Sequence, residues 1–235
     1  MDTREWIAEK VEESRGATYR TRPEGEQVLI VERTPTCGPA IVVCLERSAV
    51  EFTAADLDAV CAQIPEVDFV VGTRSSPIAH QTYHRADVLG IGLGSLGDLL
   101  FALRHADVAS ARTSERIFIE NGLARHAGVE GFGRIAKRAY EVVLGAVAAG
   151  TRRVVITKEY ELTAGEVLSL VAEHRALAID AIASSNPAAT GFGPDAHDAA
   201  RRAGVELYTW KAFLADLGSA VAQDEHRPPP HTGSR

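Results

Sequence analysis

The chain has 235 residues and a formal net charge of -7, with 46% hydrophobic and 24% charged residues. No run approaches the roughly 20 apolar residues of a membrane span, and three cysteines without a CxxC pair exclude a disulfide framework. The excess of acids disfavours a polyanionic partner unless a local basic patch overrides it. Acids near the N-terminus replace the basic and apolar runs of a secretory signal, so we expect a soluble, cytoplasmic protein without membrane contact.

The first half of the chain alternates predicted helices and strands. Thr53 is a good N-cap, and Asp56 three residues later completes an acidic capping box. In chain order we expect a helix at 3–14, a strand hairpin at 27–32 and 40–45, a helix at 54–63, a strand at 67–71, a helix at 79–85, a strand at 88–93 and a helix at 96–104.

The second half continues the alternation. An Ala-rich segment, 132–149, predicts a long helix that either opens the second unit or bridges the two units. Strands alternating with amphipathic helices favour right-handed crossovers and a mainly parallel sheet covered on both faces. After the long helix we expect strands at 154–156, 179–183 and 205–208, and helices at 163–176, 194–203 and 210–221.

The second half also repeats residues of the first. We therefore expect two tandem, related three-layer α/β units at 1–110 and 111–222, followed by a disordered tail over 223–235 that has almost nothing apolar to bury. The matching stretches are 51–56 with 161–166, 75–77 with 185–187, and 90–103 with 204–217.

Two glycine-bearing turns suggest phosphate sites. Residues 92–97 (GLGSLG) match the dinucleotide pattern GxGxxG between a predicted strand and helix. The motif stands at the end of a unit, however, and no acidic residue follows to bind a ribose, so we favour a close-packed turn. Gly191 and Gly193 precede a helix whose N-terminus could hold an anion, although a plain helix entry is the simpler interpretation.

Small polar residues follow predicted strands in both units. Ser75, Ser76, Ser184 and Ser185 lie where open α/β sheets bind ligands, at the carboxyl ends of the strands. We favour the simpler explanation that they form turns before proline, although their repetition in both units strengthens the alternative of a ligand site. Positive charge also gathers between the units, where Arg134 and Arg138 on the predicted long helix are candidates for phosphate contacts. The whole basic run is Arg125, Arg134, Lys137, Arg138, Arg152 and Arg153, against only Glu130 and Glu141.

A metal site has weak support. His80 and His84 lie four residues apart on a predicted helix, with Asp87 one turn further, so the three could share a face. The sequence lacks an HExxH pattern, and surface histidines explain the spacing as well. We expect no resident cofactor.

The element order resembles the restriction-endonuclease-like superfamily, especially Mrr-type enzymes. The residues that carry the resemblance are 180–185 (DAIASS), leading to 195–200 (DAHDAA) and 204–208 (GVELY). That family uses an Asp on one hairpin strand and Glu-x-Lys on the next to bind Mg²⁺. This chain has no Glu-x-Lys or Asp-x-Lys; Glu32 and Glu46 are the nearest approximations.

Three functional hypotheses follow. The first is a nucleotide- or nucleic-acid-associated binding or regulatory protein, built from a duplicated and catalytically degenerate nuclease-like unit. The second is a divergent Mg²⁺-dependent nuclease that uses Glu32 and Glu46, or another nucleotide-processing enzyme. The third is a protein-protein assembly module that forms a homo-oligomer.

Overall fold

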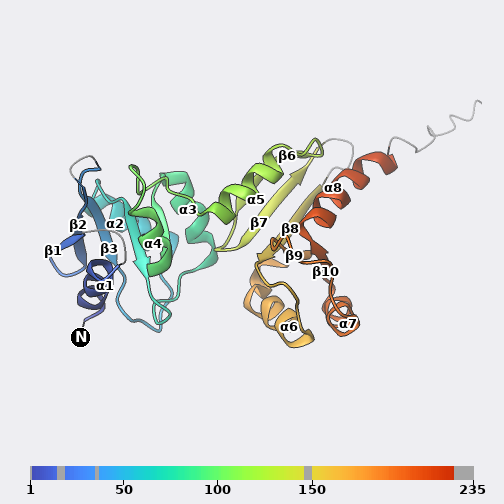
Figure 1. Cartoon of the computed structure of the whole chain (residues 1–235), viewed down its shortest axis with the longest axis horizontal. Coiled ribbons are helices and arrows are strands. Elements are labelled where there is room, and N and C mark those ends of the chain that lie inside the picture. Colours follow the sequence, from blue (N-terminus) through green and yellow to red (C-terminus); the bar gives the residue numbers. More distant parts are fainter. Residues whose placement is uncertain (1, 15–18, 35–36, 146–149, 225–235) are drawn as a thin grey trace, which may run out of the picture. The chain divides into compact units, whose positions relative to one another are not determined.

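The computed structural model describes residues 2–14, 19–34, 37–145 and 150–224. The chain divides into unit 1, residues 1–116 with 135–137, and unit 2, residues 117–134 with 138–235. Each unit has a five-stranded mixed sheet with helices packed against it (Figure 1). The prediction of two tandem three-layer α/β units is therefore confirmed.

Unit 1 has the strand order β1-β2-β3-β4-β5, antiparallel from β1 to β3 and parallel from β3 to β5. The predicted hairpin of β2 and β3 is confirmed, whereas β1 was not foreseen. The elements are α1 (Thr3–Glu12), β1 (Arg20–Glu24), β2 (Val28–Glu32), β3 (Ala40–Cys44), α2 (Ala54–Gln63), β4 (Phe69–Gly72), α3 (His80–Leu89), β5 (Gly92–Ser95) and α4 (Leu96–Ala102).

Two apolar clusters cover the faces of the unit 1 sheet. Ile7 of α1 and Leu99 of α4 pack on one face with Phe69. Leu57 of α2 and Tyr83 of α3 pack on the other. Alternation along the strands sends successive side chains to opposite faces, so both clusters draw on the same short strands.

Unit 2 repeats this order, with β10-β9-β8-β7-β6 as its sheet. Its strands β8, β9 and β10 are parallel, and β6, β7 and β8 are antiparallel. The elements are α5 (Ser114–Ala124), β6 (Val129–Arg134), β7 (Ala139–Leu144), β8 (Gly150–Thr157), α6 (Ala164–Glu173), a 3₁₀ turn (Arg175–Leu177), β9 (Ala181–Ser184), α7 (Pro194–Ala203), β10 (Glu206–Thr209) and α8 (Trp210–Asp224).

The duplication extends to individual hydrogen bonds. Asp68, ahead of β4, accepts a bond of 2.8 Å from the backbone N–H of Ile41. Asp180, ahead of β9, accepts one of 2.7 Å from the N–H of Arg153. Thr53 and Thr163 both open their helices with complete capping boxes. The same local devices therefore fix the same positions in both units.

The predicted long helix over 132–149 is wrong. Its first part forms β6 and β7, and residues 146–149 lie outside the described residues. On β7, Tyr140, Val142 and Leu144 are buried in the core cluster of unit 2, which is a strand periodicity. Pairing with β8 thus overrides the helical propensity of the alanines, and α5, which was not predicted, is the helix that precedes this hairpin.

Two smaller boundaries also differ from prediction. The strand expected at 88–93 begins only at Gly92, because α3 continues through Val88 and ends at Gly90 with φ +70°. A left-handed residue of this kind is the usual end of a helix before a turn. Residues 223 and 224, which were expected to belong to a disordered tail, are part of α8, and the rest of the predicted tail, 225–235, lies outside the described residues.

Candidate functional site

Serine hydroxyls tie together the loops at the carboxyl ends of the parallel strands. Ser76 donates to the carbonyl of Glu46 at 2.8 Å, next to the end of β3. Ser185 donates to the carbonyl of Thr157 at 3.0 Å, and Ser184 to that of Glu159 at 2.6 Å. All three serines are buried. They serve to shape this edge, which leaves Ser75 as the exposed hydroxyl of the predicted set.

The loops at this edge differ in length between the two units. Residues 73–76 separate Gly72 from Pro77, whereas only 185–186 separate Ser184 from Pro187. Residues 45–52 lead from β3 to the cap of α2, whereas only 158–162 lead from β8 to the cap of α6. The β3–α2 connection is thus extended in unit 1, whereas the whole β4–α3 connection, 73–79, is shorter than the β9–α7 connection, 185–193.

The β3–α2 and β4–α3 loops of unit 1 contact each other. The backbone N–H of Ser48 donates to the carbonyl of Ser75 at 2.9 Å. Each loop carries one exposed arginine directly before that bond, Arg47 and Arg74. Neither arginine side chain forms an ion pair or hydrogen bond with another residue of the described ranges. The edge therefore presents two available guanidinium groups and the Ser75 hydroxyl, which is a suitable donor set for an anion.

The two glutamates of the nuclease hypothesis do not come together. In the β2–β3 hairpin Val31 pairs with Ala40 and Val28 with Val43. Glu32 thus lies beside the beginning of β3, whereas Glu46 follows its end. At about 3.3 Å per residue, roughly 20 Å separates them. The expectation that both would bind one Mg²⁺ is wrong for this reason.

The GxGxxG motif forms a close-packed turn. A Cβ on Gly92 would lie 2.2 Å from the ring of Phe69, and one on Gly94 would lie 2.6 Å from Asp98 Oδ2. The Asp98 carboxylate accepts bonds from the backbone N–H and the hydroxyl of Ser95, at 2.8 and 2.6 Å. Because a protein carboxylate already caps α4, the glycines serve packing here, in agreement with the favoured interpretation.

The second glycine turn is a weaker candidate for an anion site than its sequence predicts. Gly193 is the N-cap of α7, with Pro194 as the first helical residue, and Gly191 has φ +146°. Asp195 stands in the first turn, where its negative charge already complements the helix dipole. The anion site at Gly191 and Gly193 stays a prediction.

The histidine pair lies on α3, with His80 partly buried and His84 exposed. Asp87 forms an ion pair of 2.9 Å with Arg116. Across the described ranges, no group of three or more His, Cys, Asp or Glu side chains is arranged to hold a metal ion.

No described helix is long and apolar enough to cross a membrane.

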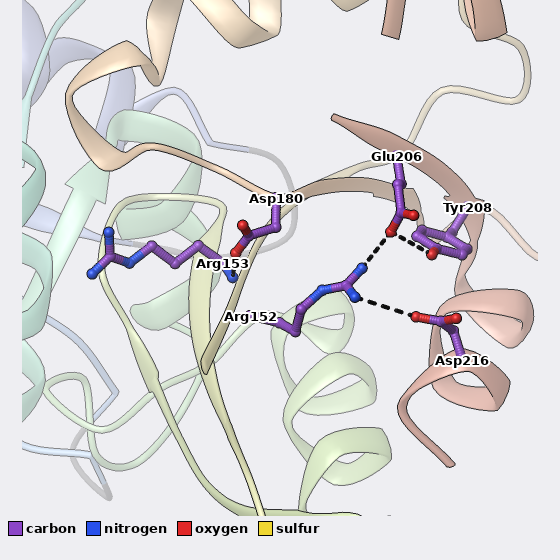
Figure 2. Close-up of polar contacts among 6 residues, drawn as sticks. All are labelled: Arg152, Arg153, Asp180, Glu206, Tyr208 and Asp216. Carbon is purple, nitrogen blue, oxygen red and sulfur yellow. Dashed lines mark hydrogen bonds and ion pairs between the residues drawn. The ribbon is translucent and has the colours of Figure 1, made fainter. Parts of the chain in front are cut away.

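The basic run does not form a helix face. Arg134 is a buried residue at the end of β6, and Arg138 is exposed in the β6–β7 connection. Arg153, on β8, bonds to Glu141 at 2.9 Å, and Figure 2 shows it extending away from the Arg152 side chain. The expectation that these cations face only Glu130 and Glu141 is wrong, since Arg152 also has acidic partners.

Those partners come from segments distant in sequence. Arg152 bonds to Glu206 of β10 at 2.6 Å and lies 3.5 Å from Asp216 of α8. The Tyr208 hydroxyl donates to Glu206 at 2.7 Å (Figure 2). The hydrogen bond from Tyr208 is the main cause that lowers the pKa of Glu206, and the Arg152 guanidinium lowers it further, whereas desolvation opposes the shift. Burial, followed by the bond to Glu206, raises the pKa of Tyr208 to about 12.

Comparison with known proteins gives no relative from which to assign a function. No family model, no curated protein and no solved structure matches this chain. The sequence reasoning missed Arg47 and Arg74 because each is a single arginine in a loop. The detectable signal was the extra length of the β3–α2 loop relative to its repeat, since loops that tolerate insertions often carry function.

Proposed function

We propose that the chain is a non-catalytic binding protein that recognises a phosphate group of a nucleotide or of a nucleic-acid end at the carboxyl edge of unit 1. Arg47 and Arg74 would each offer a planar pair of N–H donors to phosphate oxygens, and Ser75 a hydroxyl. Arginine is the residue suited to this planar recognition. We call this surface the Arg47–Arg74 edge.

The observation that carries the proposal is the meeting of two arginine-bearing loops at one place. Each loop brings an exposed arginine without a partner in the described ranges, and a backbone bond joins the loops at Ser48 and Ser75. Packing alone does not require exposed, unpaired arginines. A bond between the loops limits their freedom before binding, which reduces the entropic cost of capturing a ligand.

The strands argue against catalysis at this edge. If the chain is a relative of the restriction-endonuclease-like proteins, its hairpin strands β3 (AIVVC) and β8 (GTRRVVIT) should carry Glu-x-Lys, and neither contains an acid or a lysine. The order of one helix, three antiparallel strands, a helix and a parallel strand is consistent with the resemblance. A degenerate relative would retain the binding edge without the metal chemistry.

Charge favours a small ligand. The net charge of -7 and the acidic partners of Arg152 and Arg153 weaken any extended path for a phosphate backbone. Glu46 is exposed beside Arg47 and repels anions locally. A single terminal phosphate needs only the two arginines, whereas a long duplex needs a row of them.

The test is fluorescence anisotropy with a short, 3′-labelled oligonucleotide, with and without a 5′-phosphate. The wild type should bind the phosphorylated form more tightly, and Arg47→Gln with Arg74→Gln should weaken binding at least about tenfold. Arg175→Gln with Arg202→Gln is the matched control, because these exposed arginines of unit 2 also lack partners in the described ranges. Equal binding of both oligonucleotides would refute the proposal.

Glu46→Gln separates binding from the nuclease alternative. Under the binding proposal, removing the neighbouring negative charge tightens phosphate binding. A divergent nuclease would instead show Mg²⁺-dependent cleavage that Glu46→Gln diminishes. Gel analysis of the same oligonucleotide with Mg²⁺ and Mn²⁺ distinguishes the two, and cleavage lost in the variant would favour the enzyme.

A further inference from the structure

A chain of hydrogen bonds through two hydroxyls joins the β3–α2 and β4–α3 loops of unit 1. The Ser76 hydroxyl donates to the Glu46 carbonyl at 2.8 Å. The Thr73 hydroxyl lies 3.2 Å from that of Ser76, and because Ser76 gives its proton to Glu46, Thr73 is the donor of this bond. The backbone N–H of Ser75 donates in turn to the Thr73 hydroxyl oxygen at 3.2 Å. Bonds linked in this way polarise and strengthen one another.

This chain of bonds lies largely out of water. Ser76 is 5% exposed, and Thr73 is partly buried. A hydrogen bond that is shielded from solvent is not readily exchanged for one with water, since breaking it leaves buried polar atoms unsatisfied. The two loops are therefore held in one arrangement before any ligand binds.

The backbone of Arg47 is fixed from both sides. The residue before it, Glu46, accepts the Ser76 bond through its carbonyl. The residue after it, Ser48, donates its N–H to the Ser75 carbonyl at 2.9 Å. Both bonds cross to the β4–α3 loop, so the Cα of Arg47 cannot move far without breaking one of them.

The backbone of Arg74 is held in the same way from the other loop. Thr73, on one side, bonds to Ser76, whose hydroxyl reaches the β3–α2 loop. Ser75, on the other side, accepts from Ser48. The N–H of Ser76 also donates to the Thr73 carbonyl at 3.1 Å, which closes a turn around Arg74. The two arginines therefore extend from backbone positions whose separation is fixed.

A bond of the same kind occurs in unit 1 away from the arginines. Thr82 of α3, which is fully buried, donates to the Phe52 carbonyl at 3.1 Å and so ties α3 to the end of the β3–α2 loop. No arginine is adjacent to Thr82 or Phe52 in the sequence. Thr82 therefore offers a matched control for a hydroxyl bond that supports the fold alone.

We infer that Ser76 and Thr73 are positioning residues, which hold Arg47 and Arg74 at the separation that lets both guanidinium groups bind one terminal phosphate. This role rests on the proposed phosphate function and deepens it. A terminal phosphate presents three acceptor oxygens to two planar donor groups, and an internal diester presents fewer. Fixing the pair of arginines in advance removes the cost of ordering them when the ligand binds.

The test measures whether the two arginines act together. Fluorescence anisotropy with the 5′-phosphorylated oligonucleotide gives the affinities of the wild type, Arg47→Gln, Arg74→Gln and the double variant, each with and without Ser76→Ala. A ligand held by two groups at a fixed spacing loses most of its affinity when either is removed. The double variant should therefore be weakened less than the product of the single effects, by at least about fivefold. In the Ser76→Ala background the single effects should multiply.

The hydroxyls can also be tested one at a time. Ser76→Ala and Thr73→Val should each weaken binding of the phosphorylated oligonucleotide about three- to tenfold, because the ligand must then order the loops. Thr82→Val should bind as the wild type does. Hydrogen exchange of the Ser48 N–H should be faster in Ser76→Ala than in Thr82→Val, since only the first variant releases the two loops from each other.

The positioning role and the phosphate site can be refuted separately. A wild type that binds both oligonucleotides equally refutes the proposed function and the positioning role with it. A wild type that prefers the 5′-phosphate, with folded Ser76→Ala and Thr73→Val proteins that bind as it does, overturns the positioning role alone. A loss of affinity that Thr82→Val reproduces, or arginine effects that combine in the same way with and without Ser76→Ala, would also overturn it.

Discussion

Substituting Gly92 should destabilise unit 1 although most glycine-to-alanine changes in a strand do the opposite. Alanine restricts the unfolded chain and by itself adds about 0.5–1 kcal/mol of stability. Here the new Cβ would lie 2.2 Å from the ring of Phe69, which is 3% exposed in the core. Overpacking of this kind costs about 1–3 kcal/mol, so we expect a net loss of about 1–2 kcal/mol.

The assay uses the two tryptophans, of which Trp6 belongs to unit 1 and Trp210 to unit 2. In a Trp210→Phe background, Trp6 fluorescence during urea unfolding reports unit 1, and the linear extrapolation gives its free energy of unfolding. Gly97→Ala is the matched control. A Cβ there meets nothing closer than 3.8 Å, and the position is helical, so this change should stabilise by up to about 1 kcal/mol.

A double-mutant cycle tests the cause. Phe69→Leu removes part of the ring that meets the new methyl group, so the cost of Gly92→Ala should be smaller by about 1 kcal/mol in that background. If Gly92→Ala and Gly97→Ala shift the unfolding free energy equally, or the cycle shows no coupling, the motif is not a close-packed turn and its glycines are available to a ligand.

Three further predictions concern stability and reactivity. Thr53→Ala should lower the unfolding free energy of unit 1, and Thr163→Ala that of unit 2, by about 1 kcal/mol each through loss of the N-cap; the tryptophan of the same unit should report each change. Cys44 should resist a thiol reagent at pH 8 in the folded protein and react on unfolding, because burial raises its pKa to about 12. Because folding lowers the pKa of Glu206, this carboxylate stabilises unit 2 above the pKa of an unfolded glutamate, and the stabilisation is lost as pH falls through the folded value. Because folding raises the pKa of Tyr208 to about 12, unit 2 loses stability as pH rises from about 10 to about 12. The measurement is the urea midpoint of the Trp210 signal as a function of pH, in the wild type and in Glu206→Gln. The same pH dependence in both proteins would contradict this assignment.

The sequence by itself determined the alternation of elements and the duplication. Short-range signals were enough, because an N-cap such as Thr53 and a helix end such as Gly90 act on neighbours a few residues away. The same signals recur at Thr163 and Gly204, so the two units could be recognised as related before any contact was known. Boundaries of α7 were predicted to the residue, since Pro194 and Gly204 mark both ends.

Only the tertiary structure decided which strands replaced the predicted helix over 132–149 and which charges are neutralised. Local propensity favours helix for the alanines, but β7 gains its hydrogen bonds and burial from β8, a partner that propensity does not include. Arg152 finds Glu206 across 54 positions of sequence. Arg47 and Arg74 likewise become neighbours only because parallel strands end at one edge of a sheet, which no local pattern in either loop records.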